Sequence, residues 1–245
     1  MKLVQKARLA LAALYCALSS LAIRADTIKF SGYEWETRTA KKQGPGPNDW
    51  NSKNAFVDAE GRLHLKISRQ ADRWSCAEIT SKKLFGFGRY QFQVIGGIDR
   101  LDKNVVLGLF NYPAPNADPD TTNEIDIEFA HWGNDSYPIG NYTIWPAKPG
   151  FKQTSKTFDF KLKDDKTTHR FLWKSDSIKY QSLAGFQEDN KNEFASFLFK
   201  PENPFDLIPQ KKEPVHLNLW LFHGQAPLDG KEVEIIIKSF VFSEK

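Results

Sequence analysis

Short segments in which apolar and polar residues alternate recur from residue 62 to residue 242. This period predicts β-strands, because successive side chains of a strand point to opposite faces. The clearest segments are RLHLKI (62–67), GRYQFQV (88–94), NVVLGLF (104–110), EIDIEF (124–129), HRFLWK (169–174), HLNLWLF (216–222) and EVEIIIKSFVF (232–242). Turn signals separate them, and no long amphipathic helix interrupts the series. Many short strands joined by loops predict an all-β fold, an antiparallel sandwich.

The first residues have a different character. A positively charged start with Lys2, Lys6 and Arg8 precedes a short apolar run over residues 9–18, and small residues follow. This pattern predicts a secretory signal peptide over residues 1–25, cleaved after Ala25 or Ala22, and one domain over residues 26–245. The alternative is an amphipathic first helix of the domain. The apolar run is too short for a good membrane span, and no later segment is a candidate. We therefore expect a secreted or periplasmic protein without membrane association in its mature form.

Size, charge and cysteine content narrow the function classes further. The 245 residues suffice for one sizeable domain with its own core, and we expect a monomer. A net charge of +4 without a basic block gives no reason to expect a nucleic-acid partner. Since Cys16 falls in the predicted signal peptide, Cys76 is left without an intrachain disulfide partner, and we expect it to be a buried small apolar residue.

The segment EIDIEF places Glu124, Asp126 and Glu128 on one face of a strand and apolar residues on the other. Glycoside hydrolysis usually needs two carboxyl groups, one ionised and one protonated. The negative charge of Asp126 should resist ionisation of a neighbouring glutamate, so that one glutamate stays protonated near neutral pH. The alternative is a solvent-facing polar stripe on an edge strand.

Geometry sets a condition on this interpretation. Residues four apart on a strand are roughly 13 Å apart at Cα. The two carboxyls of a retaining glycosidase lie only about 5–5.5 Å apart. The side chains of Glu124 and Glu128 must therefore lean together, which the concave face of a curved sheet favours.

The motif EIDIEF resembles the active-site motif of glycoside hydrolase family 16, in the form without a β-bulge that is typical of lichenase-type β-glucanases and xyloglucan-modifying enzymes. Four further segments resemble the family in the same order: FGFGRYQFQV, LGLFNY, HRFLWKSDSIKYQSLAG and HLNLWLF. The resemblance implies a β-jelly-roll sandwich of two antiparallel sheets, with a substrate cleft across the concave sheet. It also implies a retaining endo-β-glycosidase that hydrolyses O-glycosidic bonds of a polysaccharide, in the first place a β-glucan, without a cofactor.

The resemblance assigns roles to individual residues. Glu124 occupies the position of the nucleophile, Glu128 that of the acid/base, and Asp126 that of an assisting carboxylate. The predicted substrate contacts are Glu78, Phe110, Tyr112, Asn141, Asn218 and Trp220. Asn218 and Trp220 share the polar face of HLNLWLF, where Trp220 suits the apolar face of a sugar ring, whereas we expect Trp173 to be core. For His131 and Trp132 two interpretations stay open, substrate contact or capping of the strand end.

Three departures from the family pattern limit what it implies. Thr122 stands where lichenases have a tryptophan, which weakens the assignment to mixed-linkage glucan. Lichenases also have a second cysteine to pair with the one that resembles Cys76. Lys238 stands where many members have a calcium-binding aspartate, so we predict no metal site. We expect the loop PAPNADPDTT (113–122) to form part of the cleft rim and, together with GPGPNDW (44–50), to govern the choice of linkage.

Other functions remain open at this point. A transglycosylase would pass the sugar to another sugar in place of water. A lectin-type domain could share the same sandwich, but it would not need Glu124, Asp126 and Glu128 together. An unrelated secreted β-sandwich with an accidental acidic strand is the last alternative.

Overall fold

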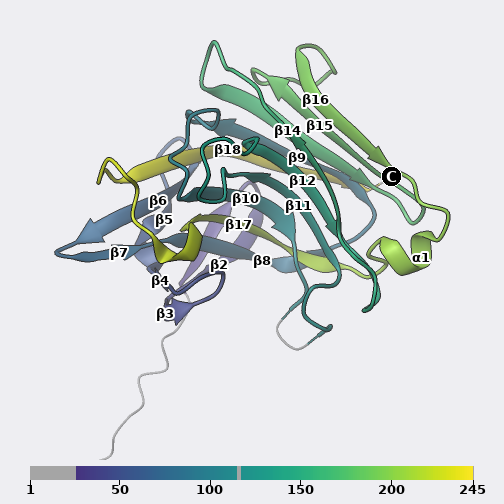
Figure 1. Cartoon of the computed structure of the whole chain (residues 1–245), viewed down its shortest axis with the longest axis horizontal. Coiled ribbons are helices and arrows are strands. Elements are labelled where there is room, and N and C mark those ends of the chain that lie inside the picture. Colours follow the sequence, from purple (N-terminus) through teal and green to yellow (C-terminus); the bar gives the residue numbers. More distant parts are fainter. Residues whose placement is uncertain (1–25, 115–116, 245) are drawn as a thin grey trace, which may run out of the picture.

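A computed structural model of the chain describes residues 26–114 and 117–244. The predicted signal peptide and Cys16 lie outside these residues. Two large antiparallel sheets are layered on each other, with one small sheet beside them (Figure 1). This confirms the predicted jelly-roll sandwich. No helix in the described part of the chain is both long enough and apolar enough to cross a membrane.

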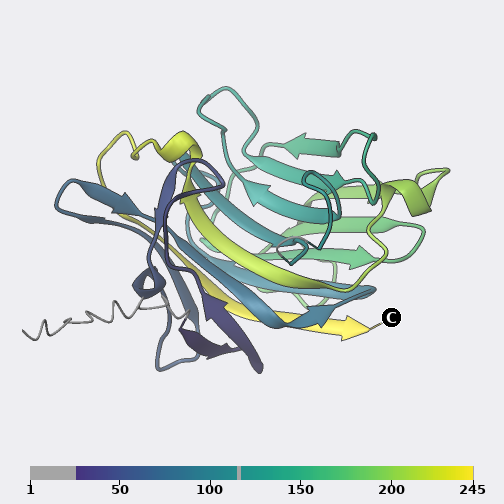
Figure 2. The same cartoon turned by 90° about the horizontal axis from the view of Figure 1, so that it is seen from below.

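The sheet that contains the acidic strand is called the cleft sheet here, and Figure 2 shows that its strands curve. Its strands are, in spatial order, β1 (Thr27–Phe30), β2 (Tyr33–Thr37), β8 (Ala77–Phe85), β17 (Glu213–Leu221), β10 (Val105–Asn111), β11 (Glu124–Phe129), β12 (Gly140–Trp145) and β13 (Thr154–Phe158). The acidic strand β11 is therefore an inner strand, which excludes the edge-strand interpretation of EIDIEF.

The second sheet is called the back sheet. Its strands are, in spatial order, β16 (Glu193–Phe199), β15 (Ile178–Ala184), β14 (Lys166–Trp173), β9 (Gly88–Ile95), β18 (Val233–Glu244), β6 (Leu63–Gln70) and β5 (Ala55–Val57), and β7 (Arg73–Ser75) pairs with β6. The small sheet pairs β3 (Ala40–Gln43) with β4 (Asn48–Trp50). Helical turns cover Ser52–Asn54, Phe222–Gly224 and α1 (Pro204–Leu207).

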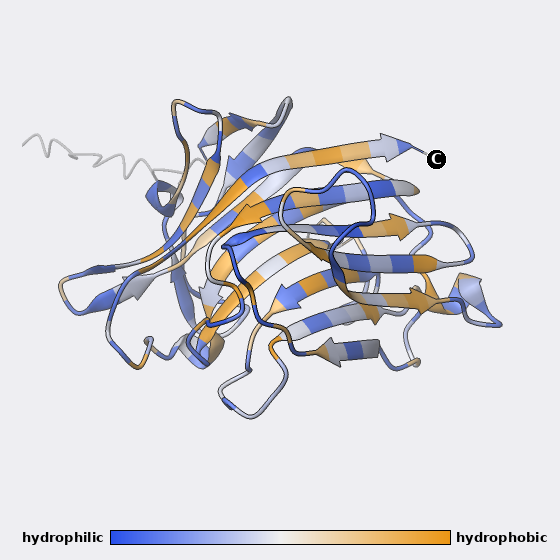
Figure 3. Ribbon diagram, turned by 90° about the horizontal axis from the view of Figure 1, so that it is seen from above, coloured by the Kyte–Doolittle hydropathy of each residue, from blue (hydrophilic) through white to orange (hydrophobic). Residues whose placement is uncertain are grey.

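Alternation along the strands builds the core between the sheets, and Figure 3 shows it as alternating bands of hydrophobic and hydrophilic residues. In the cleft sheet one apolar row crosses five strands in register: Ile79, Leu217, Leu109, Ile127 and Tyr142. All five are fully buried. Because the inward positions are filled in this way, the positions between them face the opposite side of the cleft sheet.

Aromatic side chains fill the core on the side of the back sheet. Tyr90 stacks on Phe171 with ring centroids 4.3 Å apart. Trp173 is fully buried, and its indole N–H donates to the carbonyl of Pro209 at 2.8 Å, which confirms the core assignment of Trp173. Cys76 is also buried, as expected, and it is a free cysteine within the described residues.

Hydrogen bonds tie the strand beside β11 to the back sheet. The hydroxyl of Tyr142 donates to Ser182 Oγ at 2.6 Å, and the hydroxyl of Tyr180 donates to the carbonyl of Thr143 at 2.9 Å. The ring of His169 lies 2.8 Å from both Ser182 Oγ and Thr167 Oγ1, and burial lowers the pKa of His169 to about 3. A neutral, hydrogen-bonded histidine therefore packs behind the cleft sheet, against Phe129.

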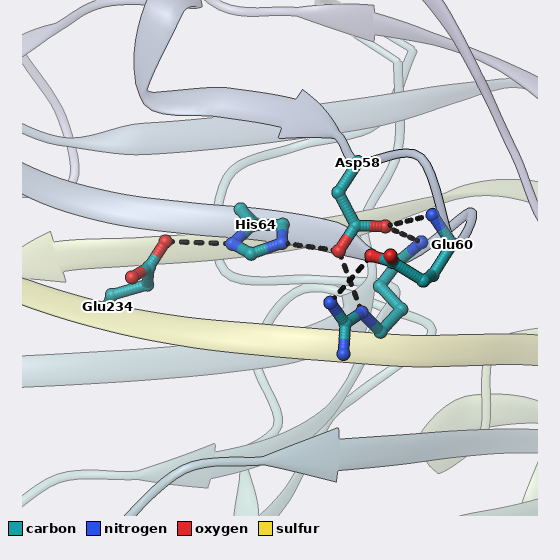
Figure 4. Close-up of polar contacts among 5 residues, drawn as sticks. Asp58, Glu60, His64 and Glu234 are labelled. Carbon is teal, nitrogen blue, oxygen red and sulfur yellow. Dashed lines mark hydrogen bonds and ion pairs between the residues drawn. The ribbon is translucent and has the colours of Figure 1, made fainter.

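A charged cluster joins three parts of the back sheet (Figure 4). His64 on β6 lies with Nε2 2.9 Å from Asp58 Oδ2 and with Nδ1 2.8 Å from Glu234 Oε1 on β18. Arg62 Nε donates to Asp58 at 2.7 Å. Although burial opposes it, the pKa of His64 is raised by its hydrogen bonds to Asp58 and Glu234. The imidazolium therefore links the turn after β5 to the last strand.

Candidate active site

The three acids of β11 lie on an inner strand of the cleft sheet, between β10 and β12. Glu128 lies opposite Gly108 on β10 and opposite Asn141 on β12. Asp126 lies opposite Phe110 and Thr143 in the next row. The apolar side chains of Ile125, Ile127 and Phe129 are fully buried in the core. The sequence folds in this way because only one face of EIDIEF is fit to enter that core.

An open cleft of about 1170 Å³ lies over this face of the sheet. Seven of the nine predicted site residues line it: Glu78, Phe110, Tyr112, Glu124, Glu128, Asn218 and Trp220. Pro113 and Ala114 also line it, as expected for the loop that precedes β11, and so do Gly44 and Pro45 from the other loop. The structure thus brings together residues from five distant segments of the chain.

Two predicted site residues do not line the cleft. Asp126 is only 2% exposed and lies below the other two acids. Asn141 is 4% exposed, and its amide nitrogen donates to the carbonyls of Ala130 and Ile139 at 3.2 and 3.0 Å. Both residues neighbour Glu128 or Glu124 without facing open space, so a direct substrate contact of Asn141 stays a prediction.

The surroundings of the three acids separate their protonation. Burial raises the pKa of Glu124 to about 7, although a hydrogen bond with Asp126 lowers it in part. Burial and the charge of Glu124 raise the pKa of Glu128 to about 8. Burial and the charges of both glutamates hold the pKa of Asp126 well above its ordinary value. Of these three neighbouring carboxyls, Glu124 therefore ionises first as the pH rises. Glu128 and Asp126 keep their protons to higher pH.

This order of ionisation gives Asp126 a different role from the one that the sequence indicated. We expected the charge of Asp126 to keep a neighbouring glutamate protonated. In the structure the charge that acts on Glu128 is that of Glu124. Asp126 is more deeply buried than either glutamate, and its own pKa is raised by both, so a protonated Asp126 donates a hydrogen bond to an ionised Glu124. The physical reason is depth, which alternation along a strand does not encode.

Glu78 belongs to a second polar group on the cleft floor. Its Oε2 accepts from Arg38 Nη1 at 3.0 Å and lies 3.5 Å from Asn218 Nδ2. Its Oε1 lies 3.5 Å from His216 Nδ1. Although burial opposes it, the pKa of Glu78 is lowered by His216 and Arg38. Glu78 is thus an ionised carboxylate, with a set of surroundings quite unlike those of the three acids on β11.

Trp220 both lines the cleft and packs into an aromatic cluster. It is 7% exposed, with the rings of Trp132 and Phe222 at centroid distances of 6.2 and 6.5 Å. Trp132 also packs edge-on against Phe222 at 5.6 Å. His131 Nδ1 lies 2.6 Å from the carbonyl of Tyr137. Of the two interpretations left open for His131 and Trp132, these contacts favour a role in building the end of the strand.

The positions that depart from the family pattern have local partners. The hydroxyl of Thr122 donates to the carbonyl of Pro119 at 2.6 Å, and Thr122 is buried. Lys238 Nζ donates to Gln93 Oε1 at 2.9 Å and lies 4.3 Å from the centre of the Phe186 ring. Within residues 26–114 and 117–244, no group of three His, Cys, Asp or Glu side chains has the arrangement of a metal site.

The polar cleft residues that the sequence interpretation missed include Arg38, Thr80 and His216. The signal for His216 was present, because it shares a face with Asn218 and Trp220 in HLNLWLF. Thr80 is two residues beyond Glu78 and shares its face by the same rule. Arg38 follows β2 in a segment without clear alternation, so only the fold brings it to Glu78.

Comparisons with known proteins give a consistent result. A relative, a β-glucanase of Paenibacillus macerans, is 26% identical over 155 residues, and the match spans 62% of this chain and 62% of that protein. A solved prokaryotic β-1,3-1,4-glucanase (lichenase) from a mouse hindgut metagenome superimposes with a TM-score of 0.63 at 20% identity, covering 91% of this chain and 100% of that chain.

A glycoside hydrolase family 16 endo-glucanase from Bacteroides ovatus, solved in complex with G4G3G-2F-DNP, gives a TM-score of 0.65 at 14% identity and covers 85% of this chain and 94% of that chain. At these identities the two structures show a shared fold. The family model for glycosyl hydrolases family 16 matches residues 47–221, which is most of this chain and includes all nine predicted site residues. The chain therefore belongs to glycosyl hydrolases family 16.

Proposed function

We propose that the protein is a secreted, monomeric, retaining endo-β-glycosidase that hydrolyses a β-glucan. One observation carries the reaction type: Glu124 and Glu128 line the same cleft, and their surroundings let Glu124 ionise before Glu128. A retaining glycosidase needs one ionised and one protonated carboxyl at its reacting bond. Membership of the family supports the same reaction.

The proposed reaction has two steps. In the first, the carboxylate of Glu124 attacks the anomeric carbon of the sugar while Glu128 gives its proton to the leaving glycosidic oxygen. This yields a glycosyl ester on Glu124 and a free chain end. In the second, Glu128, now ionised, takes a proton from water, and that water attacks the same carbon and releases Glu124. Asp126 supports the first step by its hydrogen bond to the Glu124 carboxylate.

The substrate class rests on the cleft and on the relatives. The cleft is open, and both aromatic and polar side chains line it, as a sugar polymer requires. The relative from Paenibacillus macerans is a β-glucanase, and the structural neighbour from the mouse hindgut metagenome is a β-1,3-1,4-glucanase. Residues 1–25, with the composition of a signal peptide, support secretion.

The experiment incubates the purified protein with mixed-linkage β-1,3-1,4-glucan, laminarin, xyloglucan, agarose and carrageenan, and follows new reducing ends. Proton NMR then reads the anomeric configuration of the first product. We expect rapid shortening of a β-glucan and a β-configured product. A product of inverted configuration contradicts the double displacement. Longer chains without new reducing ends indicate transglycosylation, and binding without cleavage indicates a lectin-like domain.

A further inference from the structure

His216 is a cleft residue to which neither the sequence motif nor the acids on β11 give a role. It lies on β17, in the row of the cleft sheet that continues through Phe110 to Asp126. Its side chain is 12% exposed and lines the cleft. β17 is two strands away from β11, roughly 10 Å at about 4.8 Å per strand. A sugar bound over His216 is therefore a different sugar from the one that Glu124 would attack.

Three contacts fix the orientation of the imidazole ring. Nδ1 lies 3.1 Å from Thr80 Oγ1 and 3.5 Å from Glu78 Oε1. The ring of Phe110 stacks against it with centroids 5.1 Å apart and planes at 21°. Because Nδ1 lies beside the Glu78 carboxylate, the ring proton belongs on Nδ1, which then donates to Thr80 Oγ1. The orientation of the ring is thus set from the side of Nδ1 and from one face, and Nε2 lies at the opposite end of the ring.

Nε2 is buried and has no hydrogen-bond partner among the described residues. The same is true of Asn218 Oδ1, on the neighbouring row of the same strand. A buried polar atom without a partner is unfavourable, and an unmatched one in a cleft is a place where a ligand group gains by binding. A sugar hydroxyl can both donate and accept, so it satisfies Nε2 whether or not that nitrogen carries a proton.

We propose that His216 is a substrate-binding residue that reads a hydroxyl of a neutral sugar beyond the one attacked, together with Glu78 and Asn218. The pair of Arg38 and Glu78 completes this subsite: His216 and Arg38 lower the pKa of Glu78, so its carboxylate accepts hydroxyl protons and repels an acidic substituent. The subsite therefore selects unsubstituted β-glucan over chains that carry uronate or sulfate at this position. This inference rests on the proposed function.

The test compares two substrates of different length. Mixed-linkage β-glucan fills the cleft, whereas an aryl β-glucoside reaches only the sugar site beside the acids. We expect His216→Phe, which keeps a flat ring on Phe110, to lower kcat/KM on the polymer by roughly tenfold to a hundredfold. We expect this loss to come from a higher KM, with kcat nearly unchanged. For the aryl glucoside, kcat/KM should change by less than about twofold. His216→Gln, which keeps a polar group, regains part of the loss.

His64→Gln is the matched control, because His64 is also a strand histidine between carboxylates, but on the back sheet. We expect it to lower the melting temperature and to leave the ratio of polymer to aryl-glucoside kcat/KM unchanged. An unchanged ratio in His216→Phe overturns the inference while the proposed function stands.

A binding measurement covers a variant that folds poorly or a wild type that cleaves neither substrate. Calorimetric titration of a mixed-linkage tetrasaccharide compares Glu124→Gln with Glu124→Gln/His216→Phe. A tenfold weaker affinity of the double variant supports the subsite, and equal affinities overturn it. A wild type that cleaves neither substrate contradicts the proposed function by itself, whatever this titration gives.

Discussion

Glu124, Asp126 and Glu128 stand at alternate positions of one strand, yet each has different surroundings. Asp126 is the deepest of the three, and its pKa is raised by burial and by both glutamates. Glu124 receives a hydrogen bond from Asp126, whereas Glu128 has the charge of Glu124 beside it. Three carboxyl groups with similar ordinary pKa values thus acquire different protonation from differences in burial and neighbours.

The first prediction concerns Glu124→Gln. We expect a loss of hydrolysis of roughly 10⁴-fold or more, the order found when a hydrolase loses its nucleophile. The melting temperature should stay within a few degrees, because Gln has nearly the shape of Glu and removes a charge that repels Glu128. With that charge gone, the pKa of Glu128 should fall below about 8, which a carboxyl NMR titration measures. Turnover at the wild-type rate would falsify the assignment of Glu124.

The second prediction concerns the pH profile of kcat/KM. Since Glu124 must be ionised and Glu128 protonated, activity should rise as the pH passes about 7 and decline as it passes about 8. Asp126→Leu removes the hydrogen bond that lowers the pKa of Glu124, so the acidic limb should move to higher pH. Asp126→Asn still carries an N–H donor and should keep that limb near its wild-type position. Coincident acidic limbs in all three proteins speak against this role of Asp126.

At the scale of elements, the order β8, β17, β10, β11 sets the composition of the cleft floor. One row across these strands reads Glu78, Asn218, Gly108 and Glu128. Gly108 has no side chain, and the amide of Asn218 occupies the space above it: a Cβ at Gly108 would lie 2.4 Å from Asn218 Oδ1. The position of Asn218 between Glu78 and the acids of β11 therefore depends on a glycine in the neighbouring strand.

The third prediction is that Gly108→Ala displaces the Asn218 amide. We expect KM for β-glucan to rise severalfold, and stability to fall by about 1–3 kcal/mol, the usual cost of adding a methyl group to a packed site. Gly86→Ala is the control, since its nearest contact is the flexible side chain of Lys212 at 3.0 Å. Kinetics and thermal unfolding of both variants decide: equal KM values would show that Asn218 is free to move without consequence.

At the scale of the whole molecule, the described sandwich buries one carboxyl that it does not pair, that of Glu213. Glu213, at the start of β17, is 2% exposed, and neither of its carboxyl oxygens has a hydrogen-bond partner among the described residues. Burial, with the charges of Asp118 and Glu124, raises the pKa of Glu213 to about 9. The folded protein therefore holds a proton on Glu213 that the unfolded chain releases near its ordinary value of 4.5.

The fourth prediction follows from the sign of this shift. A raised folded-state pKa gives stability that is complete below pH 4.5 and is lost as the pH rises towards about 9. The wild-type melting temperature should therefore fall between pH 6 and pH 9. Glu213→Gln has no proton to lose at this position. Over the same pH range, its melting temperature should fall by at least about 3 °C less than that of the wild type. Thermal scans at both pH values test this, and parallel curves for the two proteins contradict it.

The sequence by itself determined the faces of the strands. Period-two alternation fixed that Glu124 and Glu128 point away from Ile125 and Ile127, and that Asn218 and Trp220 point away from the leucines of β17. It also determined the fold class, because many short alternating segments have few ways to bury their apolar faces other than a sandwich. Alternation did not predict the strands β8 and β12, because tertiary packing buries both of their faces in part and their sequences alternate only weakly.

Only the tertiary structure determined how deeply each side chain is buried and which residues surround it. It placed Asp126 below its neighbours, turned Asn141 to backbone carbonyls and brought Arg38 to Glu78, and it left Glu213 without a hydrogen-bond partner among the described residues. None of these is a property of a strand. Burial and charge act through space, and His216 and Glu78 are 138 positions apart in the chain although their side chains lie 3.5 Å apart. A pKa depends on such neighbours, so it becomes defined only when the two sheets have packed.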